Sequence, residues 1–146
     1  MRTVVDDASL LAILAQRAGA TLAAAAEAGE VISTGSWYYR LHRALHDPLS
    51  EGPLSKMVAL LPPAARNALF VLLDDLPPAI VVPGPRVLVP VMGALGLRRR
   101  VNYLTAEALA AAVVNQARIR VTVETALLRG ACEELNIPLE VLTPYQ

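Results

Sequence analysis

Four carboxylates lie at sequence positions where they could bind a metal ion. Asp6 and Asp7 follow a short β-branched run, Glu124 follows another, and Glu107 lies near the start of an alanine-rich helix. Clustered carboxylate oxygens suit Mg²⁺ or Mn²⁺, hard cations that retain several bound waters. Such an ion can activate a water for attack on a phosphodiester. These acids therefore predict metal-dependent phosphodiester hydrolysis, provided that the fold brings them together.

The elements that must position these acids alternate between strand and helix. Apolar and β-branched runs predict strands at residues 3–5, 31–33, 119–122 and 139–142, with a further candidate at 79–82. Helical spacing and turn residues predict helices at 9–18, 20–28, 36–47, 62–76, 86–97, 106–117 and 125–135, and a turn-rich segment at 48–56. Ser36 and Thr105 are the expected N-caps of the helices that they precede.

This alternation predicts the fold class and the placement of the acids. Four short apolar strands separated by helices indicate a three-layer α/β/α fold with a short parallel sheet. No repeat or linker divides the chain, so we expect a single domain over residues 1–146. The strand ends and helix starts share one edge of such a sheet, so Asp6, Asp7, Glu107 and Glu124 should converge there.

A purely structural role for the acids remains open. The first turn of a helix favours acidic residues because of the helix dipole, and Asp7, Glu107 and Glu124 each occupy such a position in the predicted elements. Helix capping therefore explains the position of each acid taken by itself, whereas metal binding explains why all of them are expected at the same edge of the sheet.

The sequence resembles the PIN domain family over its whole length. Its opening, Val4-Val5-Asp6-Asp7-Ala8-Ser9-Leu10-Leu11, has an acid after the first strand and Ser two residues after Asp7. The C-terminal third places Glu107 on a helix, Thr122-Val123-Glu124 after a strand, and then a helix and a final strand. This resemblance implies a parallel α/β/α fold. In active members it implies a Mg²⁺- or Mn²⁺-dependent endoribonuclease, often a bacterial type II toxin that pairs with an antitoxin.

The resemblance also implies roles for individual residues. Asp7, Glu107 and Glu124 would be catalytic metal ligands and Asp6 an auxiliary one, while Ser9 and Thr122 would orient the carboxylates or a bound water. The family has a further Glu on the helix after the second strand, but residues 35–45 contain no acid and Arg40 stands in that region. A guanidinium there can pair with the remaining carboxylates without a metal. The alternative hypothesis is therefore a catalytically inactive PIN-like domain that binds protein or RNA.

Three further groups of residues have chemical potential. Arg98, Arg99 and Arg100 form a basic run ahead of Glu107, and Arg40 follows three aromatic residues, so these cations are candidate RNA contacts. His42 and His46 are four residues apart, the spacing of paired metal ligands on a helix. The sequence offers no convincing third ligand, and this favours solvated or partner-facing imidazoles over zinc.

Composition narrows the remaining function classes. Thirteen basic residues balance thirteen acidic ones, so any nucleic-acid contact must be local. The single Cys132 excludes an internal disulfide and fits a reducing cytoplasm. Asp6 and Asp7 interrupt any secretory signal, and charges and prolines interrupt every long apolar run, so we expect neither export nor a membrane span. The apolar excess and the family resemblance together predict a homodimer.

Overall fold

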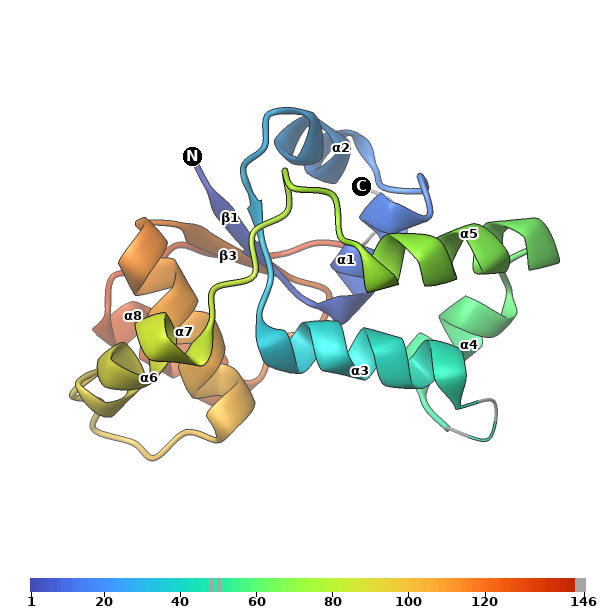
Figure 1. Ribbon diagram of the computed structural model, residues 1–146. Coiled ribbons are helices and arrows are strands. Elements are labelled where there is room, and N and C mark those ends of the chain that lie inside the picture. The colour runs from blue at the N-terminus through green and yellow to red at the C-terminus, as the bar shows by residue number, and fades with distance from the viewer. Residues whose placement is uncertain (48, 50, 144–146) are drawn as a thin grey trace.

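The computed structural model describes residues 1–47, 49 and 51–143 (Figure 1). Its centre is a parallel sheet of four strands: β1 (Thr3–Val5), β2 (Val31–Ile32), β3 (Arg118–Val121) and β4 (Leu139–Val141). The strand order is β2-β1-β3-β4, and every neighbouring pair is parallel. This confirms the predicted parallel sheet. The first and third strands are neighbours, so the ends of β1 and β3 come together.

Eight helices surround this sheet in the described part of the chain. They are α1 (Asp7–Leu14), α2 (Ala20–Glu27), α3 (Gly35–His46), α4 (Pro53–Ala59), α5 (Pro63–Asp74), α6 (Pro85–Gly93), α7 (Tyr103–Asn115) and α8 (Ala126–Glu134). Proline occupies the first turn of α4, α5 and α6, where its missing N–H leaves no helical hydrogen bond unmade.

Two apolar cores lie on opposite faces of the sheet. In β1, Val4 belongs to the core formed with α6, α7 and α8, whereas Val5 belongs to the core formed with α1 to α5. Successive strand side chains point to opposite faces, so this short strand contributes to both cores. Figure 1 shows the same division, with α6, α7 and α8 on one side of the strands and α1, α3, α4 and α5 on the other. The predicted three-layer α/β/α fold is confirmed.

Two predicted helix starts are wrong. Thr34, not Ser36, caps α3 by accepting a hydrogen bond from the Trp37 N–H at 3.2 Å. Asn102, not Thr105, caps α7 by accepting one from the Thr105 N–H at 2.9 Å. Several residues near each start have cap-forming side chains, and the sequence alone does not rank them. The earlier start of α7 moves Glu107 beyond its first turn.

Two other expectations also need correction. The turn-rich segment predicted at 48–56 includes Pro48 and Ser50, which lie outside the described residues, but its later part forms the start of α4. Within the candidate strand at 79–82, Val81 makes an isolated parallel bridge to Ile32 and no longer ladder. A proline on each side leaves room for only this short pairing.

Strand β3 is not continuously apolar as predicted. It alternates Arg118-Ile119-Arg120-Val121, with the two aliphatic residues buried and the two arginines partly exposed. Both arginines pair with Glu140 on the neighbouring β4. No helix in the described residues is long and apolar enough to cross a membrane.

Candidate functional site

Asp6, Asp7, Glu107 and Glu124, here called the carboxylate edge, are held by different elements. Asp6 follows β1 and is the N-cap of α1, where it accepts a hydrogen bond from the Ser9 N–H at 3.0 Å. Its other oxygen accepts two more, from the Thr122 N–H at 2.6 Å and the Thr122 hydroxyl at 2.7 Å. Asp6 therefore joins the ends of β1 and β3, and both of its oxygens have partners.

Asp7 begins α1 and is buried, with 8% of its surface exposed. One oxygen accepts the Ala8 N–H at 2.8 Å. The other, Oδ2, lies 3.2 Å from the Arg40 Nε on α3 but has no well-aligned hydrogen bond. Burial raises the pKa of Asp7, with the negative charge of Asp6 adding to the effect and Arg40 opposing it. Arg40 thus supplies the positive charge that faces this carboxylate.

Glu107 projects from α7 toward the start of α3. Its two oxygens accept from the Ser36 N–H at 2.8 Å and the Ser36 hydroxyl at 3.2 Å. The Ser36 N–H belongs to the first turn of α3, where backbone donors have no helical partner and the helix dipole favours an anion. Glu107 also raises the pKa of Tyr103, one turn earlier on α7, through its charge and a hydrogen bond. The carboxylate is therefore held between two helices.

Glu124 lies between β3 and α8 and is partly exposed. It forms an ion pair with Arg129 of α8, and Arg129 has a raised pKa because Glu124 accepts its hydrogen bond. In residues 1–47, 49 and 51–143, Glu124 shares no hydrogen-bonding or ion-pair partner with Asp6, Asp7 or Glu107. Hydrogen bonds therefore join Asp6 to the Ser9 backbone and to Thr122, whereas Asp7, Glu107 and Glu124 are held by separate partners.

The candidate RNA contacts are solvent-accessible. Arg98, Arg99 and Arg100 lie between α6 and α7 and are exposed, and the backbone N–H of Arg98 donates to Glu134. Tyr103, at the start of α7, is 57% exposed, and Tyr39, beside Arg40, is 64% exposed. In Figure 1 the segment between α6 and α7 and the helix α3 lie along the same lower side of the molecule. Cations and accessible rings are thus available in the segment before α7 and on α3.

The donor set of the carboxylate edge fits a neutralised cluster better than a bound Mg²⁺ or Mn²⁺. Arg40 faces Asp7 and Arg129 faces Glu124, while hydrogen bonds take both oxygens of Asp6 and of Glu107. The Asp7 Oδ2 is buried and lacks a hydrogen bond, so it is the oxygen at which a divalent cation would compete with the Arg40 guanidinium.

Sequence reasoning missed two partners of the carboxylate edge. Ser36 holds Glu107, and Arg129 holds Glu124. The unpaired backbone donors expected at the start of α3 are a signal for the first contact, although only the tertiary fold says which acid reaches them. Arg129 lies five residues after Glu124 across a helix start, and a local ion pair can be anticipated there.

Comparison with known proteins assigns this chain to no family. No protein-family model matches the sequence, and no curated protein sequence resembles it.

Proposed function

We propose that this protein is a non-catalytic PIN-like module that binds single-stranded RNA beside a carboxylate edge neutralised by arginine. The contact between Arg40 Nε and Asp7 Oδ2 at 3.2 Å carries this proposal. It puts a guanidinium on the helix where the family has an acid, against a carboxylate that would otherwise bind metal. The parallel sheet with helices on both faces supports the PIN-like part of the proposal.

RNA is the partner favoured by the surface near this edge. The exposed run Arg98–Arg100 offers fixed positive charges for phosphates, and Tyr39 and Tyr103 offer exposed rings on which bases can stack. Arginine also pairs with phosphate through two parallel hydrogen bonds. The chain has no net charge, so the interaction depends on this local group rather than on a general positive field.

A metal-dependent ribonuclease of toxin type is the second candidate function. One observation favours it: Asp7 Oδ2 is buried without a hydrogen bond, and its partner Arg40 has a side chain that is 56% exposed and free to swing outward. In this alternative Asp7, Glu107 and Glu124 hold Mg²⁺ or Mn²⁺, which supplies a metal-activated water.

Binding and cleavage of RNA separate the two candidates. Fluorescence anisotropy with a labelled single-stranded RNA, in the presence of a chelator, should show binding that weakens as salt rises. The combined change Arg98→Ala, Arg99→Ala and Arg100→Ala should reduce the slope of log K against log salt by about 2, because each lost phosphate contact removes about 0.7. A matched control, Arg17→Ala with Lys56→Ala and Arg86→Ala, removes equal charge from other elements and should keep the slope closer to that of the wild type.

The remaining outcomes decide against the proposal. Cleavage of the RNA on addition of Mn²⁺, lost in Glu124→Gln, would establish the ribonuclease instead. Absence of RNA binding at low salt by folded protein would overturn the RNA-binding role and direct the search to a protein partner.

A further inference from the structure

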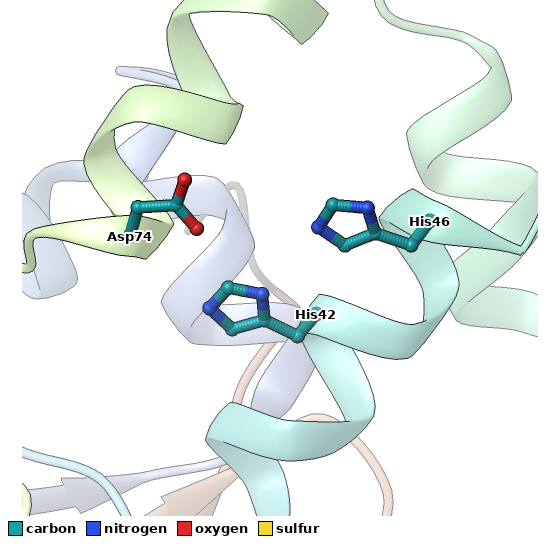
Figure 2. A group of neighbouring side chains, drawn as sticks. All are labelled: His42, His46 and Asp74. Carbon is teal, nitrogen blue, oxygen red and sulfur yellow. The ribbon is translucent and has the colours of Figure 1, made fainter.

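A cluster of metal-binding side chains lies away from the carboxylate edge, between α3 and α5. Figure 2 shows His42 and His46 projecting from α3 toward Asp74, the last residue of α5. One ligand atom from each residue lies within 4.8 Å of the others. The two histidines are four residues apart and so share one helix face, while the carboxylate comes from a helix that packs beside them. Asp74 is therefore a candidate third ligand, which the sequence did not reveal.

The His42 ring is already oriented as in a metal-ligating histidine. Its Nε2 lies 3.0 Å from the backbone oxygen of Leu73, and a carbonyl oxygen only accepts, so Nε2 carries the proton in this contact. The Nδ1 lone pair is then free for a metal. Histidine ligands usually donate their second N–H to a carbonyl or carboxylate, and this contact fixes the tautomer and the ring plane.

Neighbouring aromatic rings hold both imidazoles in place. Tyr38 meets His42 edge-on at 4.9 Å between ring centroids and donates its hydroxyl to the same Leu73 oxygen. Phe70 meets His46 edge-on at 4.9 Å, and the two imidazole rings are parallel with centroids 5.8 Å apart. These contacts reduce the conformational freedom that the two side chains would lose on binding an ion.

The charge around the cluster suits a cation. Asp74 and Asp75 are adjacent and exposed, and among the residues that the structure describes neither pairs with a lysine or arginine. Burial and then these two negative charges raise the pKa of Tyr38. The carboxylates beside the two imidazoles thus have no competing side-chain cation in the described part of the chain.

The donor atoms select the kind of ion. Two imidazole nitrogens and one carboxylate oxygen suit Zn²⁺ or a neighbouring transition metal, whereas Mg²⁺ and Ca²⁺ prefer an all-oxygen set. In a tetrahedral zinc site the ligand atoms lie about 3.4 Å apart, given metal–ligand distances of about 2.0–2.1 Å. The ligand atoms here lie within 4.8 Å of one another. Because His46 and Asp74 are exposed, small side-chain rotations can shorten these distances to that spacing, and solvent can supply the fourth ligand of the ion.

We propose that His42, His46 and Asp74 bind a Zn²⁺ ion that cross-links α3 to α5, with water as the fourth ligand. This site is independent of the carboxylate edge and of the proposed RNA binding. Because the ligands come together only in the folded chain, Zn²⁺ should also raise the melting temperature.

Calorimetric titration of the chelator-treated full chain with Zn²⁺ tests the proposal. We expect one ion per chain in the wild type. Asp74→Asn and His46→Gln should each weaken binding by at least about 10-fold, as loss of even an indirect ligand contact does. Asp75→Asn is the matched control, because it removes an equal charge from the adjacent position, and it should retain most of the affinity. His42 is left unchanged, since its ring also supports Tyr38 and Leu73.

A second readout identifies the ligands directly. Co²⁺ bound at the same site should give the visible absorption of a tetrahedral ion, and Asp74→Asn should reduce that absorption while Asp75→Asn should not. Folded wild-type protein that binds no Zn²⁺, or Zn²⁺ binding of equal strength in Asp74→Asn and Asp75→Asn, would overturn the proposed site.

Discussion

At the residue scale, Arg40 sets the charge next to the buried Asp7. Without it, a desolvated carboxylate would lie next to a second one, Asp6, with no cation in contact. An unpaired buried charge costs free energy, either directly or through protonation of the carboxyl group. The contact therefore stabilises the fold, and it also competes with any divalent ion for the same oxygen.

The titration of Asp7 gives a test of this arrangement. Burial raises its pKa above the ordinary value of 3.8. The folded state therefore holds the proton more tightly, and the stabilising contribution present below pH 3.8 is lost as the pH rises through the folded pKa. Asparagine cannot ionise, so the stability of Asp7→Asn relative to wild type should increase as the pH rises through the folded pKa of Asp7. Urea unfolding at several pH values measures this difference; a difference that stays constant or falls with pH would contradict the account.

At the element scale, the parallel strands were predicted closely because short apolar runs between helices leave few other options. The bounds predicted for β1 agree with the structure, and those for β2, β3 and β4 differ by one residue at one or both ends. Helix α4 was missed because Pro53 and Ser55 are typical of turns, yet proline also suits a first helical turn. The partners of the candidate-site acids depend on which helix N-termini pack together in the folded chain. Local sequence patterns do not show that packing.

The cross-strand pair of β3 and β4 predicts an acid-dependent loss of stability. Hydrogen bonding by Arg120, aided by the charge of Arg118, lowers the pKa of Glu140 from its ordinary value of 4.5. A lowered folded pKa contributes stability above pH 4.5, and this is lost as the pH falls through the folded value. Glu140→Gln should cost less than about 1 kcal/mol at pH 7, as is usual for exposed ion pairs, and less still in acid. If Glu140→Gln cost more stability in acid than at pH 7, this would argue against the ion pair of Glu140 with Arg118 and Arg120.

The end of α7 predicts a stabilising change. Its C-cap Gln116 adopts a left-handed conformation with φ 49° and ψ 46°, which strains any residue with a β-carbon. Gln116→Gly should raise the free energy of unfolding by about 0.5–1 kcal/mol, because relief of strain exceeds the added flexibility of the unfolded chain. Chemical denaturation measures the change, with Gln116→Ala as the control. A glycine variant less stable than the alanine variant would show that this strain is absent.

At the scale of the whole molecule, the parallel sheet places Asp6, at the end of β1, beside Thr122, which follows β3. The convergence of all four acids stays a prediction. The cluster of His42, His46 and Asp74 lies elsewhere because it depends on the packing of α5 against α3. The sequence shows the spacing of the two histidines but not that packing, so the proximity of Asp74 to them was not predicted. A homodimer, a cytoplasmic location and an antitoxin partner stay predictions.

The buried thiol of Cys132 can be used to measure how readily the surrounding core opens. This thiol lies in the core beside α7, is 2% exposed, and burial raises its pKa to about 11. Because the thiolate is the reactive form, a thiol reagent at pH 8 should modify native protein far more slowly than protein in denaturant. Absorbance of the released chromophore measures both rates. Equally fast labelling in the two states would mean that this part of the core opens readily.

The carboxylate edge is tested most directly by thermal melts with and without Mn²⁺ for wild type, Arg40→Glu and Arg43→Glu. All three proteins, including the wild-type reference, also carry Asp74→Asn, so that Mn²⁺ binding at the cluster of His42, His46 and Asp74 does not contribute to the melting temperature. Arg43 is an exposed arginine on the same helix and controls for the change of charge.

If Arg40 neutralises Asp7, only Arg40→Glu should gain stability from Mn²⁺, by about 3–6 °C at ten times the dissociation constant, because a carboxylate then replaces the guanidinium beside Asp7. A Mn²⁺-dependent rise in wild type that disappears in Glu124→Gln would contradict the account, since the acids would then bind metal despite Arg40.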